Sequence, residues 1–278
     1  MKPDWLKVRL DAGERFGETT RLLKQMGLKT VCEGAHCPNK CACWAKGTAT
    51  FMVLGETCTR RCGFCTVKKG AVSVPAKDEP RRLGDAVKGL GLHYVVITSV
   101  CRDDLPDGGA GHFAKCIGAA KKSGARVEAL IPDYLGSALG DILKAQPDVI
   151  SHNLETVSRL SPDVRDPRAG YEKSLRVLRT VKRLDPFVKT KSSLMLGLGE
   201  TRGEVMTAME DLRMAGVDML TLGQYLRPSA RQLPVERYLP PEEFGELEFI
   251  AERMGFACAA GPFVRSSYMA EELHGKVK

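Results

Sequence analysis

Three cysteines stand close together in the segment CTRRCGFC, at Cys58, Cys62 and Cys65, with Phe64 before the last of them. Thiolates are soft ligands, so this clustering indicates a bound metal. Three thiolates are one fewer than a closed structural zinc site or a fully covered 4Fe-4S cluster requires, and catalytic zinc usually takes His or carboxylate ligands. The segment therefore predicts an iron-sulfur cluster with one uncovered iron, which could chelate a small molecule and pass it an electron.

A second group of cysteines precedes this segment. Cys32, Cys37 and Cys43 are separated by four and five residues, and seven of the chain's ten cysteines fall between Cys32 and Cys65. Disulfides are typical of small secreted domains, whereas this chain of 278 residues begins MKPDWLKVRL, without an apolar signal core. We therefore expect a cytoplasmic protein with reduced thiols, in which the clustered cysteines bind metal.

The elements that must position these cysteines begin after residue 47. Short β-branched runs alternate with amphipathic stretches, most of them recurring about every 30 residues, which predicts parallel strands joined by right-handed helical crossovers. The predicted strands are 48–54, 94–100, 125–131, 147–155, 187–196 and 217–226. The predicted helices are 81–90, 112–124, 137–146, 171–184, 201–216 and 241–255.

Either a doubly wound sheet or a barrel satisfies this alternation. We favour a partial (β/α)6 TIM-like barrel of the α/β class, because no Gly-rich dinucleotide motif follows an early strand and polar residues recur where strands end. The predicted domains are an N-terminal extension at 1–47, the barrel at 48–226 and a C-terminal extension at 227–278. In such a barrel the functional residues gather at the carboxyl ends of the strands, and CTRRCGFC follows the first strand.

The spacing of Cys58, Cys62 and Cys65, with its aromatic residue, at the end of the first strand of a βα-repeat protein resembles the radical S-adenosylmethionine superfamily. Further motifs resemble the lipoyl synthase family within it, among them CEGAHCPNKCAC, HNLETV, KSSLMLGLGET and GPFVRSSY. The similar stretches cover roughly residues 30–270. The resemblance implies two 4Fe-4S clusters and S-adenosyl-L-methionine as cofactors.

The resemblance also implies a role for each cluster. The three cysteines of CTRRCGFC would hold a cluster whose open iron binds the amino and carboxylate groups of S-adenosylmethionine. One electron from this cluster would cleave the molecule to methionine and a 5′-deoxyadenosyl radical. The auxiliary cluster would be consumed as the sulfur source, and one of its ligands would be a serine oxygen of the RSSY motif, Ser266 or Ser267; we favour Ser267. The auxiliary ligands would then be Cys32, Cys37, Cys43 and Ser267.

The implied activity is that of a radical sulfurtransferase, which inserts two sulfur atoms at carbons 6 and 8 of a protein-bound octanoyl-lysyl group to give lipoyl-lysine. Those C–H bonds are unactivated, so no side-chain base could remove their protons and a radical is required. The implied partners are the octanoylated lipoyl domain of 2-oxoacid dehydrogenase complexes or the glycine cleavage H protein, an electron donor such as ferredoxin or flavodoxin, and an iron-sulfur carrier protein.

Four residues are candidates for contact with S-adenosylmethionine. The resemblance points to Phe64, beside the last cysteine, and to Asn153 and Glu155, which end the fourth predicted strand and whose simpler role is capping. Lys191 is a charge within an apolar strand, which is costly to bury unless it pairs with an anionic group such as the cofactor carboxylate. Gln224 ends the sixth predicted strand, where its side chain could either cap a turn or contact the ligand.

Two cysteines depart from the family pattern. Cys41 lies inside the auxiliary motif and could compete with Cys37 or Cys43, giving a closed four-cysteine cluster without the serine ligand. Cys101 stands where Asp or Asn is expected. Cys116 lies on an apolar helix pattern, which predicts a small buried hydrophobe.

The net charge of +8 arises from 42 basic and 34 acidic residues, without any block of about five or six like charges. A solvated basic surface is the simplest interpretation, followed by an acidic protein partner or anionic ligand, and then by nucleic acid. No segment approaches the roughly 20 apolar residues that cross a bilayer. We therefore expect neither nucleic acid nor membrane as a partner.

Three rival functions are weaker. Biotin synthase and the RNA methylthiolases do not combine the CEGAHCPNKCAC and RSSY motifs. An iron-sulfur electron carrier usually covers its irons with four cysteines and needs no set of six βα units. A zinc-containing nucleic-acid module would need two four-ligand sets and interleaved aromatic and basic residues.

Overall fold

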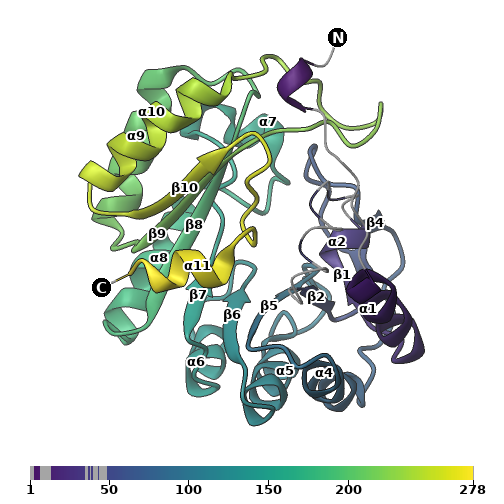
Figure 1. The fold of residues 1–278 in the computed structure, drawn as a ribbon. Helices are drawn as coiled ribbons and strands as arrows, with labels where there is room; N and C mark the ends of the chain where they lie inside the picture. The colour runs from purple at the N-terminus through teal and green to yellow at the C-terminus, as the bar shows by residue number, and fades with distance from the viewer. Residues whose placement is uncertain are drawn as a thin grey trace. The chain divides into compact units, whose positions relative to one another are not determined.

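The structure is a computed structural model of the 278-residue chain, and it describes residues 3–6, 14–34, 37, 39, 43 and 49–277. The chain forms two compact units. The first unit comprises Met1–Val8, Arg61–Cys65 and Ser151–Lys278, and the second comprises Arg9–Arg60 and Thr66–Ile150. Strands and helices alternate along both units (Figure 1), which confirms the α/β class.

In the second unit, parallel strands alternate with crossover helices. The strands are β2 (Thr50–Val53), β5 (Tyr94–Ser99) and β6 (Arg126–Leu130), paired in that order. The helices are α4 (Glu79–Gly89), α5 (Ala110–Lys122) and α6 (Ser137–Lys144). Nearly every residue of β2 and β5 is buried. Because both faces of these strands are buried, their sequences are continuous runs of mainly apolar residues.

The first unit repeats the pattern. Its paired parallel strands are β8 (Lys189–Leu196), β9 (Met219–Gln224) and β10 (Ala257–Gly261). Its helices are α8 (Tyr171–Leu184), α9 (Arg202–Met214) and α10 (Pro241–Arg253) (Figure 1). Leu178, Leu212 and Leu247, one from each helix, pack in one apolar core with Leu194 and Leu222 of the strands.

Short elements connect these repeats. In the second unit they are α1 (Glu14–Gln25), β1 (Lys29–Thr30), α2 (Val31–Gly34), β3 (Thr57–Cys58) and β4 (Lys68–Lys69). In the first unit they are the 3-10 helices η1 (Asp4–Leu6) and η2 (Ser158–Leu160), and the helices α7 (Ser161–Val164) and α11 (Ala270–Gly275). Strand β1 pairs antiparallel with β2, and β3 pairs in parallel with β4.

All six predicted strands and all six predicted helices are present, with ends that shift by a few residues. The fourth strand is shorter than predicted, because β7 covers only Val149–Ser151 and the following chain joins β8 only through an isolated bridge from Glu155 to Leu194. The sequence did not predict β10. The domain boundaries at residues 47 and 226 remain predictions. Within the described residues, no helix is both long and apolar enough to cross a bilayer.

Candidate functional site

The chain leaves β2 through a strained residue that charged side chains hold in place. Leu54 has a φ of 68°, a left-handed conformation that is costly for a residue with a side chain. Its N–H donates to Glu79 Oε2 at 3.0 Å, and its carbonyl accepts from Arg102 Nη1 at 3.1 Å. A Cβ on Gly109 would lie 2.5 Å from Leu54 Cδ1, so only glycine fits beside it. These contacts fix the turn that leads from β2 toward Cys58.

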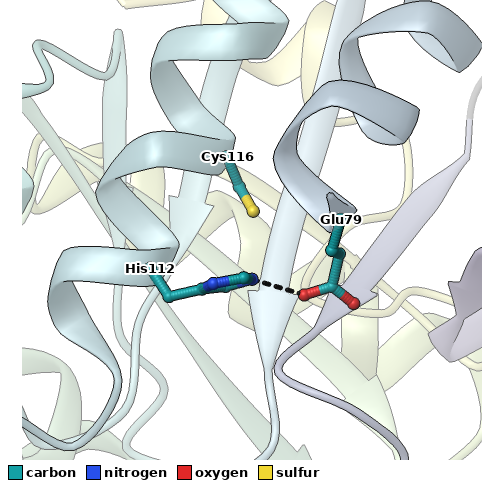
Figure 2. Close-up of side chains that lie close together, drawn as sticks. All are labelled: Glu79, His112 and Cys116. Carbon is teal, nitrogen blue, oxygen red and sulfur yellow. Dashed lines mark hydrogen bonds and ion pairs between the residues drawn. The ribbon is translucent and has the colours of Figure 1, made fainter. Parts of the chain in front are cut away.

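Glu79 also belongs to a cluster with His112 and Cys116 of α5 (Figure 2), whose potential ligand atoms all lie within 4.8 Å of one another. His112 Nε2 and Glu79 Oε2 are 2.7 Å apart, which is a hydrogen bond. Two ligands of one zinc ion lie farther apart, because each is about 2 Å from the metal in a tetrahedral arrangement. Burial raises the pKa of Cys116 and keeps its thiol neutral, as predicted for a buried hydrophobe. The cluster thus ties α4 and α5 to the end of β2.

Cys58 lies beside Cys101, which follows β5. The N–H and Oγ1 of Thr59 both donate to the Cys101 carbonyl, at 3.1 and 3.0 Å. The Cys101 thiol donates a hydrogen bond to the Cys58 sulfur and lowers the pKa of Cys58 to about 6; burial opposes this shift, and the Arg60 N–H at 3.4 Å supports it. The same hydrogen bond and burial raise the pKa of Cys101. Cys58 is therefore the more acidic thiol of the two, and a thiolate is the form that binds a metal.

The buried Arg60 guanidinium anchors this end of the cysteine loop. Its Nη2 lies 2.8 Å from Asp103 Oδ1, and its Nη1 pairs with Asp133. Asp103 also accepts from Thr59 Oγ1 at 2.6 Å. Because these bonds are charge-assisted and largely shielded from water, they hold Arg60, two residues after Cys58, against the segments that follow β5 and β6.

Cys62 and Cys65 lie in the first unit, where backbone hydrogen bonds hold their segment. The Asp166 N–H donates to Cys62 Sγ at 3.4 Å, and the Asp166 carboxylate accepts the Arg61 N–H at 2.7 Å. Hydrogen bonds from Arg168 hold the pKa of Asp166 well below its usual range. The Cys65 N–H donates to the Cys62 carbonyl at 3.2 Å. Asp166 thus orients the first of the two sulfurs, a role that the sequence did not predict.

Phe64 has a packing role. It lies against a small apolar cluster of the first unit, together with Leu233. The buried members of that cluster are Val164, Leu198 and Tyr225. Its neighbour Gly63 accepts the Leu233 N–H at 3.1 Å, and a Cβ on Gly63 would lie 3.0 Å from Leu233 Cδ1. A contact between Phe64 and the cofactor remains a prediction.

Asn153 and Glu155 lie just after β7 and alongside β8. The Glu155 N–H donates to the Ser193 carbonyl at 3.0 Å, in a backbone conformation with a φ of 70°. Asn153 Nδ2 donates to Glu155 Oε1 at 3.1 Å, and burial raises the pKa of Glu155. Asn153 Oδ1 is buried and accepts no hydrogen bond from the described residues. An orphaned acceptor beside a carboxylate fits a ligand with hydroxyl or ammonium donors, as the cofactor has.

Two further candidates are Lys191, inside a strand, and Gln224, at a strand end. Lys191 is fully buried in β8, where a charge is costly unless it pairs with an anionic group, and its contact with the cofactor remains a prediction. Gln224 is instead a structural brace. Its Nε2, which has two N–H donors, lies within hydrogen-bond distance of three carbonyls, and its Oε1 accepts the Leu239 N–H at 2.9 Å. The carbonyls belong to Leu196, Tyr225 and Arg237, at 3.0, 3.1 and 2.9 Å.

The serines of the RSSY motif, Ser266 and Ser267, are half-buried in the turn between β10 and α11. This turn lies against the end of β9, where a Cβ on Gly223 would be only 2.1 Å from the Val264 carbonyl oxygen. Arg265 Nη1 donates to the same oxygen at 2.6 Å. The serine turn is therefore held at the carboxyl end of a parallel strand, where functional residues of βα-repeat proteins gather.

The predicted auxiliary cysteines lie in the second unit. Cys32 is buried in α2, and its carbonyl accepts the Cys37 N–H at 3.1 Å. The Cys43 N–H donates to the Asn39 carbonyl at 2.9 Å, and none of the three cysteines is part of a disulfide. Cys41 lies outside the described residues. Its predicted competition with Cys37 or Cys43 as a cluster ligand therefore also concerns residues that the structure does not describe. The ligand set of Cys32, Cys37, Cys43 and Ser267 remains a prediction.

Comparison with known proteins defines the class first. Residues 52–212 match the family model of the radical SAM superfamily. Streptococcus suis SuiB bound to S-adenosylmethionine is similar in structure, with a TM-score of 0.60 and 11% identity over 80% of this chain and 54% of that chain. Methylornithine synthase (PylB) has a TM-score of 0.59 and 12% identity over 89% of this chain and 78% of that chain. These likenesses confirm a partial TIM-like barrel fold.

Curated relatives are much closer in sequence. The lipoyl synthase of Methanocella arvoryzae is 57% identical over 99% of this chain and 95% of its own length. The lipoyl synthase of Rhodopirellula baltica is 53% identical over 98% of this chain and 87% of its own length. The lipoyl synthase of Thermus thermophilus is 52% identical over 98% of this chain and 86% of its own length. The chain therefore belongs to the lipoyl synthase family of the radical SAM superfamily. The predicted family, enzyme class and sulfur-inserting activity are thereby confirmed.

Proposed function

We propose that this chain inserts sulfur at carbons 6 and 8 of an octanoyl-lysyl group by means of two clusters, of which the auxiliary one is the sulfur donor. The observation that supports it is the presence, in one chain of this family, of two three-cysteine sets and of a serine turn packed on the end of β9. A 4Fe-4S cluster with bound S-adenosylmethionine supplies a radical that can break an unactivated C–H bond.

The first cluster is assigned to Cys58, Cys62 and Cys65. The Cys58 sulfur is already favoured as a thiolate by the Cys101 thiol, and a backbone N–H points at the Cys62 sulfur. N–H and S–H donors stabilise negative charge on ligating sulfur. The proposed cofactor contacts are Phe64, Asn153, Glu155 and Lys191, of which Asn153 has the orphaned buried oxygen.

The auxiliary cluster is assigned to Cys32, Cys37, Cys43 and Ser267. A serine oxygen is a hard ligand for a sulfur-rich cluster, so its bond to iron is the weakest in this set. A cluster that must come apart in each turnover needs such a bond. Cys32 is buried, whereas Cys37, Cys43 and Ser267 are all half-buried.

The substrate of the family is an octanoylated lipoyl domain. For this chain we propose that the domain belongs to a 2-oxoacid dehydrogenase complex or is the glycine cleavage H protein. A ferredoxin or flavodoxin would supply electrons, and an iron-sulfur carrier protein would rebuild the auxiliary cluster. These partners would place the chain in the cytoplasm.

Anaerobic reconstitution with iron and sulfide tests the two-cluster assignment. Two clusters require about eight irons per chain. We expect Cys58→Ala and Cys43→Ala each to hold about four irons, with only Cys58→Ala losing cleavage of S-adenosylmethionine. Cys258→Ala removes a buried thiol that belongs to neither set and is the matched control.

Mass spectrometry of an octanoyl-lysyl peptide, incubated with S-adenosylmethionine and reductant, reports the reaction directly. The expected gain corresponds to two hydrogens replaced by two sulfurs. A chain that cleaves the cofactor but leaves this peptide unchanged would refute the sulfur-donor assignment. An iron content that Cys43→Ala does not lower would refute the auxiliary site.

A further inference from the structure

Two loops of the first unit flank the segment Arg61–Cys65, which carries two of the proposed cluster ligands. The Gly63 N–H donates to the Val164 carbonyl at 2.9 Å, in the loop that includes α7. The Gly63 carbonyl accepts the Leu233 N–H at 3.1 Å, in the loop that follows β9. A protein that approaches the backbone of this cysteine segment in the first unit therefore meets these two loops.

The second of these loops, residues 226–236, is named the arginine loop, and hydrogen bonds hold it in one shape. Arg227 Nε donates to the Gln232 carbonyl at 2.8 Å, and Ser229 Oγ donates to Gln232 Oε1 at 2.6 Å. Gln232 Nε2 donates to the Cys65 carbonyl at 3.5 Å, which joins the loop to the cysteine segment. Because the loop is already ordered, a partner that binds it loses little free energy in fixing its conformation.

The exposed side chains of the two loops and of the cysteine segment carry an excess of positive charge. The exposed arginines are Arg61, Arg168, Arg227 and Arg231, and the exposed acids are Asp163 and Glu236. Among the described residues, the Arg61 and Arg231 side chains form no ion pair, and only their N–H groups are bonded, to Asp166 and Ser229. Unpaired positive charge on an ordered surface favours an acidic partner.

Apolar side chains belong to the same surface. Phe64, Leu233 and Val235 are half-buried and pack against Val164 and Tyr225 of the small apolar cluster. A partly exposed apolar area with charged residues around it has the composition of protein interfaces. Electron carriers form interfaces at the small, short-lived end of this range.

We propose that this surface, formed by the arginine loop, Arg61–Cys65 and residues 161–168, is the docking site for an acidic one-electron carrier protein. The inference rests on the proposed function, which makes Cys62 and Cys65 cluster ligands. The uncovered iron of that cluster is reserved for S-adenosylmethionine, so electrons enter from the side of the cysteines. Because electron transfer slows steeply with distance, the carrier has to bind close to the backbone of these cysteines.

The electron step makes no bond on this chain. With a flavodoxin as the carrier, the flavin hydroquinone anion becomes the neutral semiquinone while the oxidised cluster gains one electron. No proton or atom is transferred, so the contribution of this chain is to hold the carrier near Cys65. An octanoylated substrate domain has a different requirement, because its acyl chain must reach the radical.

The first test is the affinity of the reconstituted full chain for an acidic oxidised flavodoxin, measured by isothermal titration calorimetry. We expect the double variant Arg61→Glu with Arg231→Glu to raise the Kd about tenfold, because like charges then face each other. The Kd of the parent chain should rise with ionic strength, and that of the double variant should change less. Arg176→Glu, exposed on α8 and with the same change of charge, is the matched control and should bind as the parent chain does.

The second test follows electron transfer itself, by stopped-flow absorbance of the flavin semiquinone. At a flavodoxin concentration near the Kd of the parent chain, the double variant should form semiquinone more slowly, and Arg176→Glu should match the parent chain. Dithionite is a small reductant that needs no docking surface. Cleavage of S-adenosylmethionine driven by dithionite should therefore be retained by the double variant.

The outcomes separate the inference from the proposed function. Equal Kd values for the parent chain and the double variant, or no binding of flavodoxin to the parent chain, would overturn the inference alone. An equal loss of affinity in Arg176→Glu would also overturn it, because net charge would then explain the effect. If the double variant loses affinity for an octanoylated lipoyl domain and keeps it for flavodoxin, the surface binds substrate and the inference is wrong. If the parent chain does not cleave S-adenosylmethionine with dithionite, the proposed function fails and the inference falls with it.

Discussion

Two of the proposed ligand sulfurs accept a hydrogen bond from a backbone N–H at 3.4 Å: the Cys58 sulfur from Arg60 and the Cys62 sulfur from Asp166. Such bonds stabilise charge on the sulfur, and no ordinary side-chain substitution removes them. Individual side chains then adjust what the backbone provides. Asn153 is one example, because its buried Oδ1, which has no hydrogen-bond partner among the described residues, leaves an acceptor for a ligand.

At the residue scale, Ser267→Ala tests the serine ligand. Without its oxygen the auxiliary cluster cannot form its cleavable bond, so we expect sulfur insertion to fall by about a hundredfold, the upper end of the range for loss of a group that supports a metal site. Cleavage of S-adenosylmethionine to 5′-deoxyadenosine should continue. Chromatography with mass spectrometry measures both products in one sample.

Ser266→Ala is the matched control, because it lies in the same turn and differs by one position. It should retain sulfur insertion. If Ser266→Ala abolishes lipoyl product and Ser267→Ala does not, the ligand is Ser266 and our preference is wrong.

At the scale of elements, the serine turn and the end of β9 meet where only glycine fits. Gly223 has no Cβ, and one placed there would be 2.1 Å from the Val264 carbonyl oxygen and 3.0 Å from its carbon. Because both contacts are with backbone, neither partner can rotate away. This close approach sets the position of the RSSY turn relative to β9.

Gly223→Ala should therefore displace the turn. We expect the free energy of unfolding to fall by about 1–3 kcal/mol, the usual range for overpacking, and sulfur insertion to fall with it. Gly245→Ala, on α10 with open space around it, should be neutral or stabilising. Urea unfolding followed by circular dichroism compares the two, and equal stabilities would contradict the proposed steric limit.

The start of α9 shows how pH acts on an element. Thr201 and Glu204 form a capping box, and Arg159 binds the Glu204 carboxylate. Hydrogen bonds from Arg159 and Thr201 lower the pKa of Glu204 from 4.5 to about 2. Because the folded pKa is below the ordinary value, the stabilisation is complete above pH 4.5 and is lost as the pH falls toward 2.

Glu204→Gln should thus lower the Tm at neutral pH, and the difference from the parent chain should narrow as the solution is acidified below pH 4.5. Glu210→Gln, on the same helix and outside the cap, controls for the lost charge. Calorimetry across this pH range provides the measurement. A difference that stays constant with pH would show that the carboxylate charge contributes nothing.

At the scale of the whole molecule, the net charge of +8 bears on the protein substrate. If that substrate domain is acidic, long-range attraction increases its local concentration and salt weakens the effect. We expect the KM for an octanoylated lipoyl domain to rise with ionic strength up to about 1 M, where the screening length falls to about 3 Å, with little change in kcat.

An octanoyl-lysyl peptide without acidic residues is the control, since it lacks the charge that the chain would attract. Its KM should stay nearly constant over the same salt series, followed by product mass spectrometry. The same salt response for both substrates would contradict electrostatic steering.

The sequence alone was sufficient for the alternation of strands and helices and for the two cysteine sets. Both depend on spacing along the chain: the periodicity of apolar residues predicts the strands and helices, and the spacing of the cysteines predicts the metal ligands. The prediction failed at β10, whose segment ACAAG lacks the β-branched and aromatic residues that mark a strand. That segment is extended because its backbone pairs with β9, residue for residue, from Ala257 to Gly261.

Only the tertiary structure determines which residues surround the proposed ligands. Nothing local predicts that Cys101 lies beside Cys58, that Glu79 and Arg102 hold the backbone of Leu54, or that Gln224 braces carbonyls. These residues meet because parallel strands end at a common edge after helical crossovers, so contacts join segments far apart in sequence. Ligand types are a property of the local chain, whereas the hydrogen bonds that tune them arise only when distant segments pack together.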